Sequence, residues 1–410
     1  MSELQGILLC AGSGNRMPEL TDYNSKCLLP VAGYPMFWYP LNSISRTGVR
    51  DVKLVVKADY KDAYCAVLQD PVFQWNHMKI EVITLPADQE DWGTADTLRF
   101  LRKSIKLDLL IVSGDFVSDM SLAPMIERFR CQEASACMLF SEHCVSIAAP
   151  GPKAKKPKER DFLAYCERDN KIAFCLTEED FDKPIIADSW VESHKEVQLT
   201  ARYRDCHVYL LRNTVLDVLD RETTMSSLKV DLLPWIMEVQ RETDGNAKNP
   251  WSCVGYFQPL ENGTVTAHSN NLGAYFAVNQ KMIKALPRLS ARLSAGQEFN
   301  FKATGISCQD SRVGGTSVVA GGAVLRRSSI GENVSIGEKA VIEGSVIMDG
   351  VEIGKGARVS MSILAPGVKV KEGAHVTNCI VANEQIIEKS QNIQNEIIAA
   401  DDNDDWHKAS

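Results

Sequence analysis

The sequence predicts an α/β domain with a mostly parallel sheet and flanking helices, followed by a left-handed parallel β-helix of hexapeptide repeats. Two observations predict this order. Short aliphatic runs alternate with longer helix-like segments in the first part of the chain, and a strict period of aliphatic residues takes over near its end. We expect a first domain at 1–290, a linker at 291–312, the β-helix at 313–398 and an acidic tail at 399–410.

Four aliphatic runs predict buried strands of the first domain. They are residues 7–10, 52–56, 80–83 and 109–112, and the segments 36–47, 59–69 and 93–104 between them predict helices. This alternation is typical of a parallel sheet covered on both faces. Ligands of such folds bind beyond the carboxyl ends of the strands, so we expect the chemistry in the loops after Cys10 and Val112.

A different period marks the C-terminal part of the chain. Thirteen aliphatic residues follow one another at steps of six, six and five, so one coil takes 17 residues. Three short parallel strands per coil need one inward aliphatic side chain each, and neighbouring glycines allow tight corners. The pattern is typical of a left-handed β-helix, whose flat faces and open ends commonly meet other subunits. The inward positions are Ile330, Ile336, Ile342, Ile347, Ile353, Val359, Leu364, Val370, Val376, Val381, Ile387, Ile393 and Ile398.

Composition and charge exclude several classes of protein. The 45 Lys and Arg against 53 Asp and Glu leave a formal net charge of −8, which excludes a globally basic nucleic-acid binder. No uncharged apolar stretch approaches the roughly 18 residues that span a bilayer, and the N-terminus lacks the pattern of a secretion signal. The 12 cysteines are scattered without zinc spacing, so we expect reduced thiols in a cytosolic protein.

Two charged segments allow more than one interpretation. The basic run at 153–158 contains two prolines with its flanks and predicts a solvated loop; a contact for RNA or an acidic partner, or a nuclear localisation signal, are the alternatives. The acidic tail at 399–410 predicts a solvated terminus, with capture of a basic or aromatic-binding partner as the alternative.

A candidate nucleotide site follows the first predicted strand. Paired glycines let backbone N–H groups surround a phosphate, and nearby basic side chains neutralise its charge. A carboxylate at the end of a later aliphatic strand is placed to bind Mg²⁺ beside the phosphates, although taken alone it also suits a turn or a helix cap. The candidate residues are Gly12, Gly14, Arg16, Lys26, Gly93 and Asp115.

These motifs resemble the nucleotidyltransferase domain of the nucleotide-sugar pyrophosphorylases, such as mannose-1-phosphate guanylyltransferase. The resemblance is carried by residues 9–17, 26–30 and 93–95, and it extends over nearly the whole chain because that family also has a C-terminal left-handed β-helix. It implies a nucleotidyltransferase-like first domain. It also implies that Gly12, Gly14 and Arg16 hold nucleotide phosphates, that Lys26 adds positive charge, and that Asp115 holds the metal.

Several positions depart from the active members of that family. They have Pro-Lys in place of Ser25-Lys26, a Glu-Lys pair in place of Leu176-Thr177, and Asn-x-Gly in place of the segment 205–207. A displaced version of the Glu-Lys pair at 182–184 is the alternative. His207 places an imidazole where a glycine hydrogen leaves room for the sugar. We therefore expect half of the nucleotide pocket to persist without a catalytic residue or a bound metal.

With these departures the chain resembles the pyrophosphorylase-like subunits of eukaryotic translation initiation factor 2B. The further motifs are residues 38–42, 153–158, 205–210 and 395–398. The resemblance implies a noncatalytic subunit of a multisubunit assembly that exchanges GDP for GTP on initiation factor 2. Its expected partners are the exchange-active epsilon subunit and the other subunits of factor 2B. The epsilon subunit carries a further helical domain after its β-helix, and this sequence shows none before Ser410.

Two other functions stay open at this point. One is an active mannose-1-phosphate guanylyltransferase or a related pyrophosphorylase, and the other is a noncatalytic regulator of such an enzyme. No cofactor is expected to be required, and weak binding of GTP with Mg²⁺ at the glycine loop is the alternative.

Overall fold

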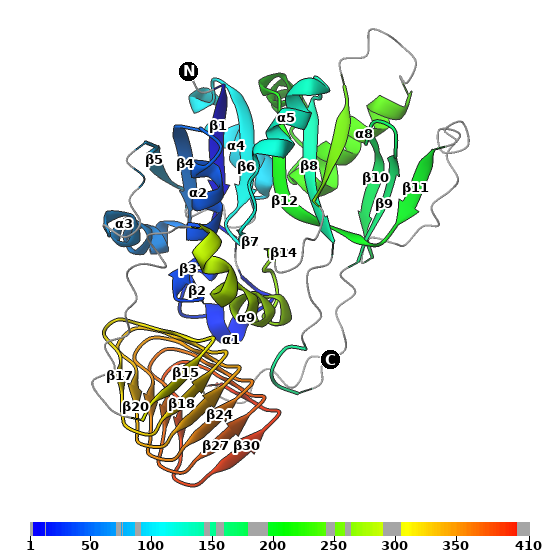
Figure 1. Cartoon of the computed structure of the whole chain (residues 1–410). Helices are drawn as coiled ribbons and strands as arrows, with labels where there is room; N and C mark the ends of the chain where they lie inside the picture. Colours follow the sequence, from blue (N-terminus) through cyan, green and yellow to red (C-terminus); the bar gives the residue numbers. More distant parts are fainter. Residues whose placement is uncertain are drawn as a thin grey trace, which may run out of the picture. The chain divides into compact units, whose positions relative to one another are not determined.

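A computed structural model gives the structure of the chain (Figure 1). It describes residues 3–12, 14–70, 75, 77–86, 92–142, 148–152, 160–178, 196–242, 251–258, 264–289 and 305–399. Contacts divide the chain into two compact units. The first comprises Met1–Gly12, Phe37–Cys144 and Lys156–His268, and the second Ser13–Met36, Val145–Lys155 and Ser269–Ser410. This division differs from the predicted boundary at 290, because two short segments and a long helix group with the β-helix.

The first unit is built on a seven-stranded sheet in the order β13-β8-β12-β6-β1-β4-β5. The four predicted strands are confirmed and are parallel neighbours. β12 runs antiparallel to its neighbours β6 and β8, and β13 runs parallel to β8. All strands of this sheet except β12 therefore run in the same direction. The strands are β1 (Leu4–Leu9), β4 (Asp51–Val56), β5 (Lys79–Thr84), β6 (Asp108–Ser113), β8 (Ala136–Glu142), β12 (Tyr203–Leu211) and β13 (Cys253–Gln258).

Helices cover this sheet. In β6, Leu109, Leu110, Ile111 and Val112 are all at most 1% exposed, so both faces of the strand are buried, as its unbroken aliphatic run predicts. The helices of this unit are α2 (Trp38–Ser45), α3 (Lys61–Gln69), α4 (Thr94–Leu101), α5 (Ala123–Cys131), α7 (Leu216–Arg221) and α8 (Leu233–Glu242). The three predicted helices correspond to α2, α3 and α4.

Two smaller sheets complete the first unit. One has the order β10-β9-β11, and the other pairs β7 with β14. Their strands are β7 (Phe116–Ser118), β9 (Asp161–Cys166), β10 (Ile172–Thr177), β11 (Val197–Thr200) and β14 (Thr266–His268). The β7–β14 pair matters for function because it joins the loop after β6 to a strand about 150 residues later in the chain.

The second unit combines a short N-terminal segment, a long helix and the β-helix. The segment contains α1 (Pro18–Thr21), β2 (Pro30–Val31) and β3 (Tyr34–Pro35), and the helix is α9 (Leu272–Leu289). The Tyr275 hydroxyl donates to the Pro30 carbonyl at 2.6 Å, and the Ala32 N–H donates to the Asn279 side chain at 2.9 Å. Both contacts fasten α9 to the β2–β3 turn.

Three parallel sheets form the left-handed β-helix, one for each side of the coil (Figure 1). The first contains β15 (Ser307–Gln309), β18 (Val324–Arg326), β21 (Val341–Glu343), β24 (Arg358–Ser360), β27 (His375–Thr377) and β30 (Asn392–Gln394). The second contains β16 (Arg312–Val313), β19 (Ser329–Ile330), β22 (Val346–Ile347), β25 (Ile363–Leu364), β28 (Ile380–Val381) and β31 (Ile397–Ile398). The third contains β17 (Val318–Val319), β20 (Ser335–Ile336), β23 (Glu352–Ile353), β26 (Lys369–Val370) and β29 (Ile386–Ile387).

The 17-residue period sets the register of this stack. Ile330 pairs with Ile347, Ile347 with Leu364, Leu364 with Val381 and Val381 with Ile398. Twelve of the thirteen predicted inward residues are at most 4% exposed, and Ile398 at the open end is partly buried. The first strand of the stack is β15, inside the segment 291–312 that the sequence predicts as a linker.

The remaining predictions concern the cysteines, membrane-spanning segments and three charged segments. The 11 cysteines of the described chain are free, and eight of them are buried. No helix among the described residues is long and apolar enough to cross a membrane. The basic run at 153–158, the alternative pair at 182–184 and the tail beyond residue 399 lie outside the described residues.

We predict that the β-helix tolerates one added residue at a corner but not within a strand. An insertion between Arg358 and Val359 turns the following inward side chain toward solvent, and each aliphatic group withdrawn costs about 2–5 kcal/mol. An insertion after Lys355 should be absorbed, because Lys355 lies at a corner between β23 and β24 and is not part of the inward stack. Thermal unfolding and the yield of soluble protein check this, and equal losses from both insertions would contradict the register.

Candidate functional site

A cavity opens at the carboxyl ends of β1, β4 and β5, the edge at which ligands bind in such folds. Its volume is about 190 Å³. It is lined by Leu9, Ala11, Gly12, Val55, Lys57, Ala58, Asp59, Leu85, Pro86, Trp92, Gly93, Thr94 and Thr97. The structure thus brings two predicted site residues, Gly12 and Gly93, to one cavity, which we call the Gly12 cavity.

The two glycines have different reasons to lack a side chain. A Cβ on Gly12 meets no atom within 4 Å, so packing does not require glycine there and the backbone stays open to a ligand. A Cβ on Gly93 would collide with the Ser226 carbonyl. The Gly93 N–H donates to Asp96 at 3.0 Å and the Ala95 N–H to the Ser226 carbonyl at 2.8 Å. The backbone N–H groups of Gly93 and Ala95, at the start of α4, are therefore already hydrogen-bonded within the protein.

Asp115 lies in the turn between β6 and β7 and is paired with a histidine. His268 ends β14, which pairs with β7, and its Nε2 lies 2.9 Å from Asp115 Oδ1. The Ser113 hydroxyl also donates to Asp115 Oδ1. The side chains of Asp115 and His268 are only 9% and 15% exposed. The predicted metal-binding carboxylate is therefore engaged by two groups of the chain itself.

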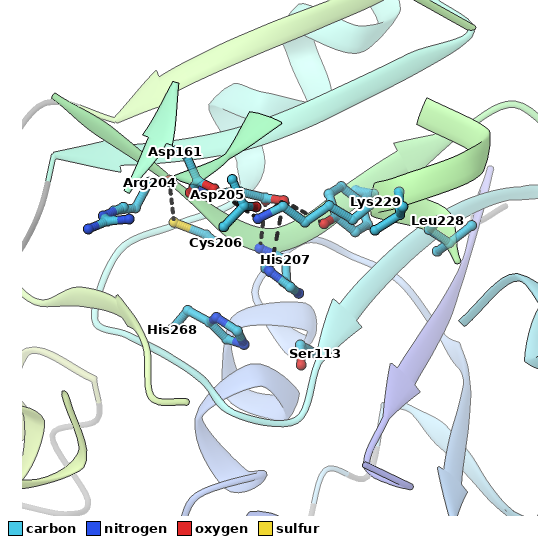
Figure 2. A network of polar contacts seen from close by, with 12 residues as sticks. Ser113, Asp161, Arg204, Asp205, Cys206, His207, Leu228, Lys229 and His268 are labelled. Carbon is cyan, nitrogen blue, oxygen red and sulfur yellow. Dashed lines mark hydrogen bonds and ion pairs between the residues drawn. The ribbon is translucent and has the colours of Figure 1, made fainter. Parts of the chain in front are cut away.

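His207 lies on the other side of His268, in an irregular part of β12. The pairing of β12 with β8 shifts register between Asp205 and Tyr209, which marks a β-bulge. His207 has φ of +53°, a conformation that glycine adopts freely and other residues adopt under strain. Its ring stacks on His268 with centroids 4.0 Å apart and an interplanar angle of 18° (Figure 2). Two stacked imidazoles thus occupy the space between Asp115 and Asp205.

A buried charge cluster holds the bulge in place (Figure 2). Asp205 accepts from the Tyr209 hydroxyl at 2.7 Å and from the His207 N–H at 2.9 Å. The Lys229 ammonium lies 3.0 Å from Asp161 and 3.9 Å from Asp205. The Asp205 N–H donates to Asp161 at 3.0 Å. One lysine therefore pairs with two buried carboxylates, which belong to strands of two different sheets, β9 and β12.

The charges of this cluster follow from its contacts. Burial raises the pKa of Asp205, but His207, Lys229 and the Tyr209 hydroxyl outweigh it, so the net pKa lies below the usual value. Burial likewise lowers the pKa of Lys229, and the two carboxylates outweigh it in the opposite direction. Burial and the adjacent His268 lower the pKa of His207 to about 3. His207 is therefore neutral at pH 7, beside a charged aspartate and a charged lysine.

The remaining predicted residues lie in the second unit. Gly14 has φ of +75°, and its carbonyl accepts from the Thr21 hydroxyl at 3.1 Å. Arg16 is exposed, and Lys26 begins a turn of 3₁₀ helix. The predicted phosphate loop from Gly12 to Lys26 is thus divided between the two units. The joint action of its residues stays a prediction.

The sequence predicts the loss of the Glu-Lys pair but not what stands in its place. Thr177 donates weakly to Asp161 at 3.4 Å, and the ammonium near that carboxylate comes from Lys229, on the π-helical turn Leu228–Leu232. Lys229, Asp161 and His268 are the residues that the sequence does not single out. A polar residue inside an otherwise apolar strand, such as Asp205, is the one signal that points to a buried partner.

The donors around Asp115 do not fit the Mg²⁺ that this fold implies. Mg²⁺ prefers several oxygen ligands in octahedral geometry, whereas Asp115 Oδ1 is already engaged by the His268 imidazole and by the Ser113 hydroxyl. In the part of the chain that the structure describes, no group of three or more His, Cys, Asp and Glu is arranged to hold a metal ion.

Fold and site together define a nucleotidyltransferase-like protein with a C-terminal hexapeptide β-helix. Residues 5–145 match the family described as "Nucleotidyl transferase", and residues 297–376 match "GlmU-like, C-terminal hexapeptide".

Relatives place the chain within this class. The "Translation initiation factor eIF2B subunit gamma" of Caenorhabditis elegans is 41% identical over 334 residues, which cover 81% of each chain. The protein of the same name from Schizosaccharomyces pombe is 23% identical over 70% of this chain and 66% of its own. A "Mannose-1-phosphate guanyltransferase" of Debaryomyces hansenii is 21% identical over 64% of each chain. The chain belongs to the family of the gamma subunits of translation initiation factor 2B, which confirms the resemblance that its sequence indicates.

We predict that His207 stays neutral down to acid pH and that this weakens the fold as the pH falls. Because its native pKa is about 3 and its unfolded pKa about 6.5, the unfolded chain binds the extra proton and stability declines below about pH 6.5. Between pH 7 and pH 5 the chain should lose about 1 kcal/mol more than His207→Asn, a value reduced for the 32% exposure of the side chain. Chemical unfolding at both pH values measures the difference.

Asparagine suits this comparison because it tolerates positive φ and does not titrate. Nuclear magnetic resonance of ¹³C-labelled histidines provides the independent check. The signal that disappears in His207→Asn should not titrate above about pH 5. A normal titration near pH 6.5 would contradict the lowered pKa of His207.

Proposed function

We propose that this chain is a noncatalytic subunit of the guanine-nucleotide exchange complex of translation initiation. It pairs with an epsilon-type subunit, joins the other subunits of factor 2B, and promotes exchange of GDP for GTP on initiation factor 2 in the cytosol. The 41% identity to a gamma subunit over 81% of the chain supports the assembly. Nucleic acid and membrane are not among its proposed partners.

One observation carries the noncatalytic part of this proposal. The imidazoles of His207 and His268 stack between Asp115 and Asp205, and both carboxylates have their hydrogen bonds from within the chain. A catalytic site instead leaves polar groups aimed at the place where the reacting atoms lie. Because Asp115 and Asp205 are already paired within the chain, we propose that they do not bind a metal or position an acceptor phosphate.

We further propose that the Gly12 cavity retains weak binding of a guanine nucleotide without turnover. Gly12 presents open backbone beside the cavity, whose lining contains one cation, Lys57, and one carboxylate, Asp59. One carboxylate against one cation is consistent with weak binding of a polyphosphate. The affinity does not depend on Asp115, because that carboxylate is paired with His268. Titration of the full chain with GTP in the presence and absence of Mg²⁺ measures this binding.

The exchange reaction tests the assembly. The chain is co-expressed with an epsilon-type subunit, and release of fluorescent GDP from initiation factor 2 is followed with the pair, with each subunit alone, and with a mannose-1-phosphate guanyltransferase replacing this chain. We expect the pair to be faster than the epsilon subunit alone and this chain alone to have no effect. A partner present at 100 times its dissociation constant adds about 2.7 kcal/mol, so the melting temperature of the pair should also rise.

A chain that stays monomeric with the epsilon subunit at micromolar concentration, and leaves GDP release unchanged, would overturn the assembly.

We predict that the purified chain forms no nucleotide sugar from a nucleoside triphosphate and a sugar phosphate. Loss of the groups that align two reactants raises the barrier by about 7–11 kcal/mol, which places transfer below detection. Pyrophosphate release, with a mannose-1-phosphate guanyltransferase as positive control, measures it. Steady synthesis that Asp115→Asn abolishes would favour the guanylyltransferase alternative instead.

A further inference from the structure

One short segment, residues 226–231, joins the Gly12 cavity to the buried charge cluster around Asp205, and we call it the linking loop. At one end the Ser226 carbonyl accepts a hydrogen bond from α4, which lines the cavity. Further along the loop, the Lys229 ammonium lies beside Asp205. The cavity, the loop and the cluster all belong to the first unit. The linking loop therefore runs from one site to the other within one compact body.

Thr94 is the side chain that touches both the cavity and the linking loop. It is the first residue of α4 and lines the cavity, and its hydroxyl oxygen accepts from the Leu228 N–H at 2.8 Å. A threonine hydroxyl also has one O–H to donate, and no acceptor among the described residues takes it. An oxygen of a ligand in the cavity is therefore a suitable acceptor for this O–H.

Thr97 lines the same cavity but has no such contact with the linking loop. Its hydroxyl donates to the Gly93 carbonyl at 3.0 Å, within the first turn of α4. Among the described residues, no hydrogen bond joins the Thr97 side chain to the linking loop. Comparing the two threonines therefore separates contact with the cavity from contact with the loop.

The linking loop is held together by its own hydrogen bonds. The N–H groups of Ser226 and Ser227 donate to Asp231 at 2.8 and 2.7 Å, and the Ser227 hydroxyl accepts from the Val230 N–H at 3.2 Å. Leu228 is only 1% exposed, so its side chain is packed in the core. Because a close-packed interior transmits strain, a displacement at Leu228 moves the loop as a whole.

Lys229 follows Leu228 directly and brings the charge of the linking loop into the cluster (Figure 2). Its ammonium lies 3.0 Å from Asp161 and 3.9 Å from Asp205, and Asp205 accepts from the His207 N–H at 2.9 Å. The attraction between charges depends on their distance, so a small movement of the ammonium changes the field at both carboxylates. The His207 ring next to them reports that change.

We propose that Thr94 and the linking loop couple the Gly12 cavity to the Asp205 cluster. A ligand whose oxygen accepts from the Thr94 hydroxyl changes the surroundings of His207, although it does not touch that residue. Donating the O–H makes the hydroxyl oxygen a better acceptor, so the Leu228 N–H bond tightens when the cavity is filled. The choice of a nucleotide as this ligand rests on the function proposed above, whereas the link through Thr94 does not.

The first experiment tests the link without a ligand, in the full chain with ¹³C-labelled histidines at pH 7. Thr94→Val keeps the shape of the side chain and removes the acceptor of the Leu228 N–H. It should shift the His207 signal, identified as the one that His207→Asn removes, by more than its linewidth. Hydrogen exchange of the Leu228 amide should become about three- to tenfold faster, the loss expected for one hydrogen bond.

Thr97→Val is the matched control, because it removes a hydroxyl from the same cavity wall and the same helix. It should leave the His207 signal and the exchange of the Leu228 amide unchanged. Thr94→Ser restores the hydroxyl and should behave as the unaltered chain. Melting temperatures establish that the three variants are folded.

The second experiment adds millimolar GTP to the full chain and to Thr94→Val, with calorimetry to measure binding. In the full chain the His207 signal should move along the binding curve and the exchange of the Leu228 amide should slow. Neither change should occur in Thr94→Val.

An unmoved His207 signal in Thr94→Val, an equal shift in Thr97→Val, or no rescue by Thr94→Ser would each overturn the coupling. GTP that binds and leaves His207 unmoved would also overturn it, while the proposed nucleotide binding would stand. If GTP does not bind, the nucleotide proposal falls, and the comparison of Thr94→Val with Thr97→Val alone decides the coupling.

Discussion

The buried carboxylate of Asp205 is the group on which the geometry of the candidate site depends. Its side chain is fully excluded from solvent, and a charge in that position needs partners. The Tyr209 hydroxyl, the His207 N–H and the Lys229 ammonium supply them. The His207 N–H reaches Asp205 because β12 bulges and His207 adopts positive φ. Satisfying one carboxylate therefore fixes the direction of the imidazole that stacks on His268.

This arrangement pairs the polar groups of the candidate site with other groups of the chain. Enzymes leave polar groups unpaired in a site because the substrate or the metal completes them. Here the completion comes from the chain, since His268 meets Asp115 and Lys229 meets Asp161. Removing His268 or Lys229 would leave a carboxylate buried without its partner, which costs about 3–5 kcal/mol of stability. Both contacts therefore stabilise the fold. These contacts belong to the first unit, whose strands and helices position every group of the candidate site.

The sequence predicts most of the fold because the buried residues form regular patterns along the chain. The 17-residue spacing of the β-helix determines register directly, and unbroken aliphatic runs predict strands such as β6. The antiparallel β12 is harder to predict, since its direction depends on pairing with β6 and β8 rather than on its own residues. The same limit applies to the site. His268 reaches Asp115 only through the β7–β14 pair, and no local pattern indicates that contact.

The β-helix shows why the outer surface can change while the fold stays constant. Its register depends on inward side chains such as Ile342 and Val359, both 0% exposed, and each coil contacts only its neighbours. Corner residues such as Glu332 and Asp349 bond to backbone groups of the adjacent turn and leave the inward stack untouched. The corners can therefore carry charged side chains without disturbing the core. In a subunit of a multisubunit complex, side chains on such corners and faces can change which partner is bound with little loss of stability.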